Sequence, residues 1–197
     1  MLLNRVEELA MNNPLRAAVQ HHGEARILRR LGGGLPGARV LEIGCGRGVG
    51  IEVILDRFGA AWVDGFDLDP QMVARARGRL ARRGDRVRVW TSDATAIDAP
   101  DAAYDAVFDF AILHHIPHWW DAVGEVHRVL RGGGRLYVEE PLRAFITNPF
   151  WAWLLEHPQN DRFDADDLRT ALVDAGFRVD AQRRLGQTFT WIIATRV

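Results

Sequence analysis

The feature that most constrains this chain is a regular alternation of short apolar runs with stretches that carry helix punctuation. Strands that alternate with helices predict a mostly parallel sheet with helices on both faces. The last two runs are joined by a short link, so they should form an antiparallel hairpin at one edge of the sheet. The runs expected to form strands are Arg39–Ile43, Ala61–Phe66, Val87–Trp90, Ala106–Phe110, Arg135–Glu139, Phe177–Ala181 and Phe189–Thr195.

Capping residues indicate where two of the helices begin and end. Asp69 followed by Pro70 is typical of an N-cap with proline at the first helical position, and Gly84 is expected to close that helix. Asp164 is expected to open another helix, which should end just before Gly176.

Composition places the chain among soluble proteins of one domain. A length of 197 residues with 48% hydrophobic content predicts one domain over residues 1–197 with a sizeable core. The net charge of −1 argues against a general polyanion binder. Cys45 is the only cysteine, which excludes an intrachain disulfide or a cysteine-metal cluster and suits a cytoplasmic location. Residues 1–31 are expected to form two helices over the sheet, and no run approaches the roughly 18 apolar residues of a membrane span.

The stretch VLEIGCGRGVG, residues 40–50, places four glycines at alternate positions directly after the first expected strand. In parallel sheets, ligands bind at the carboxyl ends of the strands, where the topology switches. A dinucleotide fingerprint does not fit, because its third glycine would fall on Val49 or Ile51. Glu42 would also repel a pyrophosphate, so this loop suits a ligand with a positively charged end.

Five segments, in order, resemble successive motifs of the class I S-adenosylmethionine-dependent methyltransferases. They are VLEIGCGRGVG, GFDLDPQMV, TSDATAI, YDAVFDFAILHHI and VHRVLRGGGRLYVEEP, and DDLRTALVDAGF continues the similarity. The chain is most similar to the small-molecule group that includes the ubiquinone and menaquinone biosynthesis methyltransferases. The resemblance implies an α/β, Rossmann-like, doubly wound sheet of seven strands, with order 3-2-1-4-5-7-6 and strand 7 antiparallel.

The same resemblance implies S-adenosyl-L-methionine as the methyl donor, with a sulfonium cation, an adenosine and a zwitterionic methionine tail. By similarity, Glu42 lies near the ammonium group of the tail, and Asp67 accepts hydrogen bonds from both ribose hydroxyls. Phe110 and Ala111 would offer backbone carbonyls to the methionine amine. The loop residues that would let the backbone approach the tail are Gly44, Cys45, Gly46 and Gly48.

Residues after the second and third strands are implied to bind the adenine. Leu68 and Met72 would flank the ring, and Asp93 with Ala94 would contact its amino edge. Met72 is equally consistent with ordinary helix packing, so its role stays open.

A basic stretch invites a different function. Seven arginines lie between Arg75 and Arg88, several of them at helical spacing, and a basic stripe can follow phosphates. However, methyltransferases that act on exocyclic amines of nucleic-acid bases carry an Asn/Asp-Pro-Pro-Tyr/Phe loop after strand four. Residues 109–112 of this chain read Asp-Phe-Ala-Ile instead. A solvated helix face is therefore favoured, and no nucleic-acid partner is expected.

Histidines follow the fourth expected strand, in the loop that the resemblance places beside the methyl group. We expect His115 to act as a general base or to orient the acceptor, with His114 beside it. Glu140 would be the carboxylate partner of His115 or its substitute, and the alternative is that His115 only lines the donor pocket. Asp109 is a weaker candidate, because it lies in the last residues of its strand. A metal site is not expected, because no acidic pair completes the H-H-x-x-H spacing.

Residues 141–163 are unusually aromatic and correspond to the insertion in which small-molecule members build the acceptor pocket. Their apolar helical stripe is also consistent with core packing or a homodimer face. Trp119 and Trp120 are expected to contribute to the same pocket. The sequence thus predicts methyl transfer to a small, largely apolar or aromatic acceptor. A non-catalytic module that binds the donor or its product is the alternative from another class, and the methylated atom stays open.

Overall fold

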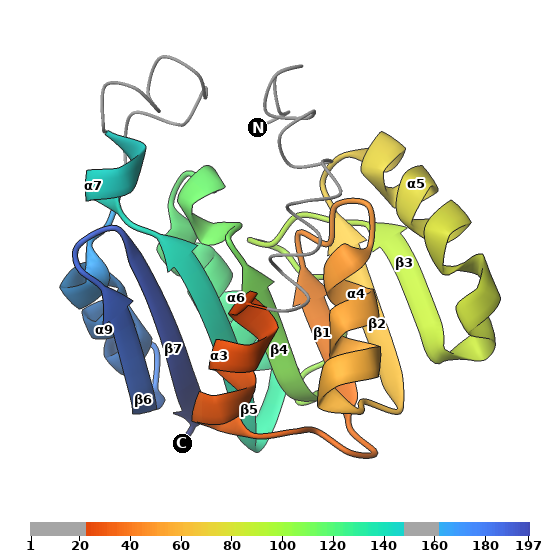
Figure 1. Cartoon of the computed structure of the whole chain (residues 1–197), viewed down its shortest axis with the longest axis horizontal. Coiled ribbons are helices and arrows are strands. Elements are labelled where there is room, and N and C mark those ends of the chain that lie inside the picture. The colour runs from red at the N-terminus through yellow and green to blue at the C-terminus, as the bar shows by residue number, and fades with distance from the viewer. Residues whose placement is uncertain (1–22, 148–161) are drawn as a thin grey trace.

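The computed structural model describes residues 23–147 and 162–197, and these form one seven-stranded sheet with helices on both faces (Figure 1). The strands are β1 (Arg39–Ile43), β2 (Trp62–Asp67), β3 (Val87–Thr91), β4 (Tyr104–Phe110), β5 (Leu130–Pro141), β6 (Phe177–Leu185) and β7 (Phe189–Arg196). The longer helices are α3 (Ala25–Gly32), α5 (Pro70–Leu80), α6 (Trp119–Val129) and α9 (Ala165–Asp174). Shorter helical segments are α4 (Val49–Val53), η2 (Ile54–Phe58), η3 (Ala81–Arg86), η4 (Leu113–His115) and α7 (Arg143–Ile146).

The strand order is β3-β2-β1-β4-β5-β7-β6, which confirms the predicted topology. β1 pairs in parallel with both β2 and β4, and the parallel pairing continues to β3 on one side and β5 on the other. β7 is antiparallel to β5 and to β6, so the last two strands form the expected hairpin at one edge.

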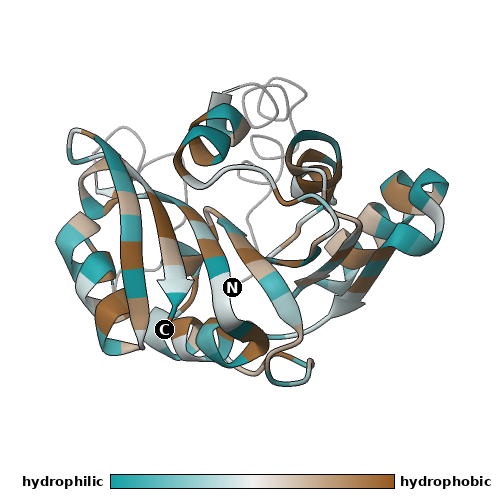
Figure 2. Cartoon of the chain, turned by 90° about the horizontal axis from the view of Figure 1, so that it is seen from below, coloured by the Kyte–Doolittle hydropathy of each residue, from teal (hydrophilic) through white to brown (hydrophobic). Residues whose placement is uncertain are grey.

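Two apolar cores lie on opposite faces of the sheet. Val40 belongs to the core formed with α3, α4, η2 and α5, whereas its neighbour Leu41 belongs to the core formed with α6 and α9. Because both faces of the central strands are buried, these strands carry apolar residues on both sides and do not show the regular polar alternation of half-buried strands. Hydrophilic and hydrophobic bands alternate along the helices in Figure 2, as expected for elements with one buried face.

β5 and β6 exceed their predicted bounds by the most residues. β5 begins at Leu130 and not at Arg135, because Leu130 pairs with Tyr104 before the register shifts. β6 continues to Leu185, past the predicted end at Ala181, because it stays paired with β7 up to the hairpin turn. Pairing with a neighbour, which local sequence does not show, sets both boundaries.

Both predicted N-caps are confirmed. The Asp69 side chain accepts a hydrogen bond from the Gln71 N–H, with 2.8 Å between Oδ1 and N. Asp164 and Asp167 form a reciprocal capping box at the start of α9. The α-helical part of α5 ends at Leu80, earlier than predicted, and the 3₁₀ segment η3 carries the chain on to Arg86.

The described part of the N-terminal region contains α3, which packs against β5 and β7 (Figure 1). The Gly32 carbonyl accepts a hydrogen bond from the Tyr137 hydroxyl at 2.8 Å, which ties the end of α3 to β5. The rest of the expected N-terminal helices, residues 1–22, lies outside the described residues. Within the described ranges, no helix combines the length and apolar character that a membrane crossing requires.

We expect Asp164→Ala to lower the free energy of unfolding by about 0.5–2 kcal/mol, because it leaves the N–H groups of Asp166 and Asp167 without their acceptor. Asp174→Ala, at the opposite end of the same helix, is the matched control. Urea denaturation of both variants provides the comparison, and an equal loss in the two would contradict a capping role.

Candidate functional site

The carboxyl ends of β1, β2 and β4 meet at one edge of the sheet. They lie together because these strands pair in parallel, with Ile43 opposite both Phe66 and Asp109. β1 is the point at which the topology switches, since the chain proceeds to β2 on one side and later returns to β4 on the other. Ligands of open parallel sheets bind at such a position.

The glycine loop after β1 folds back against β2. The Cys45 N–H donates to the Phe66 carbonyl at 2.8 Å, and Cys45 itself is buried. Gly44, Gly46 and Gly48 all have positive φ angles, of 62°, 51° and 85°, which side chains other than glycine rarely adopt.

Packing inside the protein accounts for two of these three glycines. A Cβ atom at Gly44 would lie 2.3 Å from Ile112 Cγ1, and one at Gly48 would lie 2.8 Å from Leu80 Cδ1. At Gly46, by contrast, a Cβ would have no atom of the described residues within 4 Å. Gly46 is therefore the position at which the loop presents bare backbone to open space.

Glu42 is almost completely buried at the end of β1, with a relative exposure of 2%. Its Oε2 atom has no hydrogen-bond partner among the described residues. Burial, and then the nearby Asp67 and Asp109 carboxyl groups, raise the pKa of Glu42 well above its ordinary value. A buried carboxylate with an unpartnered oxygen is costly, so this group favours a proton or a cationic ligand.

Asp67 connects the glycine loop to the start of α5. Its Oδ2 accepts from the Gly46 N–H at 2.8 Å, and its Oδ1 accepts from the Asp69 N–H at 2.9 Å. Burial raises the pKa of Asp67, while these two backbone donors act in the opposite direction. Each carboxylate oxygen keeps a second lone pair, so the group can still accept hydrogen bonds from a ligand.

The residues predicted to contact an adenine lie at the ends of β2 and β3 with different exposure. Leu68 is half exposed, whereas Met72 and Ala94 are buried. Asp93 is exposed, and its Oδ1 accepts from both the N–H and the hydroxyl of Thr95. Asp93 therefore stabilises its own turn, and the predicted contacts of these four residues with adenine stay predictions.

The loop after β4 turns sharply at the site. Ala111 has a φ of 63°, in the left-handed region, and its N–H donates to the Glu139 carbonyl at 2.8 Å. The preceding Phe110 is buried and stacks on Phe108, with 5.3 Å between the ring centroids. This turn leaves the backbone of Phe110 and Ala111 at the same edge as the glycine loop.

Glu140 holds this loop from the neighbouring strand β5. Its Oε1 accepts from the Leu113 N–H at 2.7 Å, and its Oε2 lies 2.7 Å from His114 Nδ1. The side chain is fully buried, which raises the pKa of Glu140 to about 8. The sequence predicted Glu140 as the partner of His115, and the structure shows this hydrogen bond with the adjacent His114.

His115 is partly exposed, and its ring centroid lies 4.0 Å from that of buried His114.

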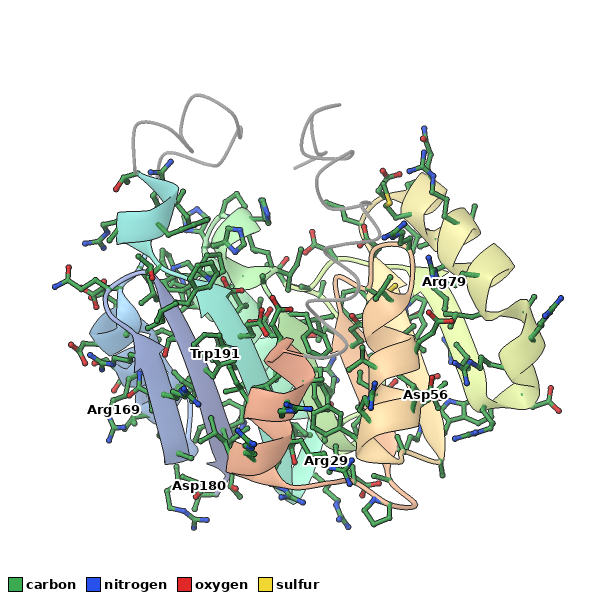
Figure 3. The ribbon with its side chains drawn as sticks, in the orientation of Figure 1. Arg29, Asp56, Arg79, Arg169, Asp180 and Trp191 are labelled. Carbon is green, nitrogen blue, oxygen red and sulfur yellow. The ribbon has the colours of Figure 1, made fainter. Side chains whose placement is uncertain are left out.

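Glu139 points to the opposite face of the sheet, where its Oε2 accepts from Trp191 Nε1 at 3.2 Å (Trp191 is labelled in Figure 3). Of the two adjacent glutamates, Glu140 therefore faces the histidine loop. Asp109, a minor candidate from the sequence, is fully buried beside Glu140.

The arginine-rich stretch is largely engaged within the protein. Arg79 pairs with Glu52 at 2.9 Å and Arg83 with Asp56 at 2.7 Å, which joins α5 and η3 to α4 and η2 (Arg79 and Asp56 are labelled in Figure 3). Two further arginines donate to backbone carbonyls, and another stacks over Trp90 at 4.5 Å. These three are Arg77, Arg86 and Arg88. Such contacts support the structural interpretation of this stretch.

The aromatic residues around the predicted acceptor insertion divide into two groups. Trp119 is buried and packs on Phe163, with ring centroids 4.7 Å apart, so it belongs to the core. Trp120 is 44% exposed, and Phe145 packs against Phe189. Residues 148–161, most of the predicted insertion, lie outside the described residues.

Among the residues described, no group of three or more His, Cys, Asp or Glu side chains could hold a metal ion.

Comparisons with known proteins agree with the arrangement at this edge. A family model described as a methyltransferase domain matches residues 40–134. A probable S-adenosylmethionine-dependent methyltransferase of Mycobacterium tuberculosis is 35% identical over 148 residues, covering 70% of this chain and 48% of that protein. A demethylmenaquinone methyltransferase of Thermus thermophilus is 38% identical over 102 residues, covering 52% of this chain and 46% of that protein. The chain thus spans about half the length of these curated relatives.

Among solved structures, the similarity extends over the whole chain. The putative methyltransferase solved in complex with the Haloferax volcanii Trm112 methyltransferase activator superposes with a TM-score of 0.79, covering 99% of both chains. The sequence identity is 18%, so this likeness concerns the fold alone.

The buried position of Glu42 depends on Gly50, since a Cβ there would lie 1.9 Å from Glu42 Oε1. We expect Gly50→Ala to destabilise the protein by about 1–3 kcal/mol through overpacking. Gly78→Ala is the control, because its Cβ would meet no described atom within 4 Å. Replacing an exposed helical glycine in this way should stabilise by about 0.5–1 kcal/mol. Thermal unfolding of the two variants measures both effects, and opposite signs are expected.

Proposed function

Because the chain belongs to the class I S-adenosylmethionine-dependent methyltransferase family, we propose that it transfers a methyl group from S-adenosyl-L-methionine to a small, largely apolar or aromatic acceptor. The observation that carries this proposal is the group of features at the end of β1: the unpartnered Oε2 atom of Glu42, the open backbone of Gly46 and the carboxylate of Asp67. When bound, the donor supplies an electrophilic methyl group on a sulfonium.

The residues at the strand ends fit this donor. The Glu42 carboxyl, with its unpartnered buried Oε2, suits the ammonium group of the methionine tail. At Gly46 no atom of the described residues lies within 4 Å of the position that a Cβ would take, so these residues leave room for the tail. Asp67 is held in place by two backbone N–H groups and retains lone pairs for the ribose hydroxyls. The remaining residues proposed for donor binding are Gly44, Cys45, Gly48, Leu68, Met72, Asp93, Ala94, Phe110 and Ala111.

The acceptor side is proposed from the loop after β4 and from the aromatic region that begins near α7. The exposed Trp120 and the ring of Phe145 are suited to contact an apolar or aromatic acceptor. The similarity to a demethylmenaquinone methyltransferase supports an acceptor of this class. Most of the arginines between Arg75 and Arg88 are engaged in contacts within the protein, which supports a small-molecule acceptor over a nucleic acid.

His115 is proposed to take up the acceptor's proton or to orient the acceptor. It is partly exposed in the loop at the same edge as the donor residues, and its ring contacts that of His114. Glu140 fixes His114 and the backbone of Leu113, so it determines where the histidine loop lies. Alignment of the two reactants would supply most of the remaining rate enhancement.

We expect the isolated protein to bind S-adenosyl-L-methionine and its demethylated product in isothermal titration calorimetry. Asp67→Ala should weaken binding by about 1.5–3 kcal/mol, as expected when a charged hydrogen-bond acceptor is removed. Asp69→Ala is the control, because that residue caps α5 and should reduce stability while donor affinity is retained. Equal donor affinity in Asp67→Ala and the parent would place the donor elsewhere.

Once an acceptor is identified by mass spectrometry with labelled donor, His115→Ala should slow single-turnover methyl transfer by about 10²–10⁴-fold, the usual effect of removing a general base. Donor affinity should stay close to that of the parent. His118→Asn, in the same segment, is the control, since asparagine tolerates the left-handed backbone of that position. A loss of donor affinity with an unchanged rate would make His115 a wall of the donor pocket. Donor binding with no transfer to any acceptor would favour a non-catalytic binding module.

A further inference from the structure

Asp109 on β4 and Glu140 on β5 form a pair of fully buried carboxyl groups on one face of the sheet. Their strands pair in parallel, and both side chains lie on the face that carries Val107, Leu136 and Val138. The two carboxyl groups interact directly, and the charge of Glu140 contributes to raising the pKa of Asp109. Two adjacent buried carboxylates repel each other strongly, so the pair favours a state that keeps one proton.

The hydrogen bonds around the pair indicate which group carries this proton. Glu140 Oε1 accepts from the Leu113 N–H, and Glu140 Oε2 lies 2.7 Å from His114 Nδ1, which donates to it in the tautomer that carries its hydrogen on Nδ1. Asp109 Oδ1 accepts from the Ile112 N–H at 3.0 Å. Asp109 Oδ2 has no donor directed at it among the described residues. This oxygen is satisfied if it is protonated and donates to Glu140.

The charged and titratable groups around Asp109 agree with this assignment. Glu140 faces it from β5 and Glu42 interacts with it from β1, while His114 lies on the far side of Glu140. Burial is the largest cause of the raised pKa of Asp109, and the neighbouring Glu140 acts in the same direction as burial. The backbone donors of the loop act against it.

We propose that Asp109 is a positioning residue that keeps its proton and donates it in a hydrogen bond to Glu140, which favours the carboxylate form of Glu140 and holds His114 and the histidine loop beside the donor site. The role of the loop in methyl transfer rests on the proposed function, whereas the protonation of Asp109 does not. Asp109 acts through Glu140 and is not placed in contact with either reactant.

Asparagine at position 109 reproduces the protonated form, because its amide can donate to Glu140 while its carbonyl oxygen accepts from the Ile112 N–H. In the parent, Asp109 binds a proton more tightly in the folded than in the unfolded chain. Its contribution to stability is therefore present at low pH and is lost as the pH rises toward the folded-state pKa. Asp109→Asn removes this titration and should make stability less dependent on pH at all pH values above the ordinary pKa of aspartate, up to the folded-state pKa of Asp109.

The experiment compares the parent with Asp109→Asn over neutral to alkaline pH by two measurements. Urea denaturation gives the pH dependence of stability, and nitrogen NMR of labelled histidines, assigned with His114→Gln, follows the protonated Nδ1 of His114. We expect the parent to lose stability and the His114 Nδ1–H signal as the pH rises, and Asp109→Asn to retain both to higher pH. Asp105→Asn, an aspartate of the same strand paired with Arg131, should behave as the parent.

The same alkaline loss in Asp109→Asn and the parent would overturn the proposal, since the titrating group would then not be Asp109. Glu140→Gln provides a second test, because a glutamine amide can donate to an ionised Asp109. In that variant the residual pH dependence of stability should move to lower pH. An unchanged midpoint of this pH dependence would count against a hydrogen-bonded pair of Asp109 and Glu140.

Calorimetry with S-adenosyl-L-methionine runs in parallel. Failure of the parent to bind it would reject the proposed function, while the stability comparison would still decide the protonation of Asp109.

Discussion

Parallel pairing of β1 with both β2 and β4 is the constraint on which the rest of the structure depends. Because the carboxyl ends of parallel strands lie at one edge, this pairing brings together the glycine loop, Asp67 and the loop after β4. The same arrangement buries both faces of the central strands, which places the adjacent residues Val40 and Leu41 in separate cores. Forming the two cores therefore also assembles the site.

Burying carboxyl groups at this edge opposes stability. Glu42, Asp109 and Glu140 are removed from water, and the pKa of each is raised chiefly by that burial. Proteins concentrate such perturbed groups at functional sites. The cost can be offset in two ways: a cationic ligand suits the carboxyl of Glu42, and a shared proton suits Asp109 and Glu140. The buried carboxyl of Glu42 and the buried pair Asp109–Glu140 would thus be stabilised by different means.

Much of the fold could be predicted from the sequence, because the signals are local. The N-caps at Asp69 and Asp164 each depend on hydrogen bonds that span two or three residues, so the side chain and its neighbours are sufficient to indicate them. The strand order came from the resemblance to a known family and not from the pattern of apolar residues. The ends of β5 and β6 were mistaken, because pairing with distant strands extends both beyond their apolar runs.

The sequence by itself determined that a glycine loop follows β1, that acidic residues end several strands and that histidines follow β4. Tertiary structure decided what each of these groups does. Gly44 and Gly48 are required by the packing of Ile112 and Leu80, which come from other elements. Glu140 lies within hydrogen-bond distance of His114, a residue 26 positions earlier in the chain, because the parallel pairing of β4 with β5 places the loop after β4 beside the end of β5. Such pairings depend on strand register and side-chain direction across the sheet, and no local pattern encodes either.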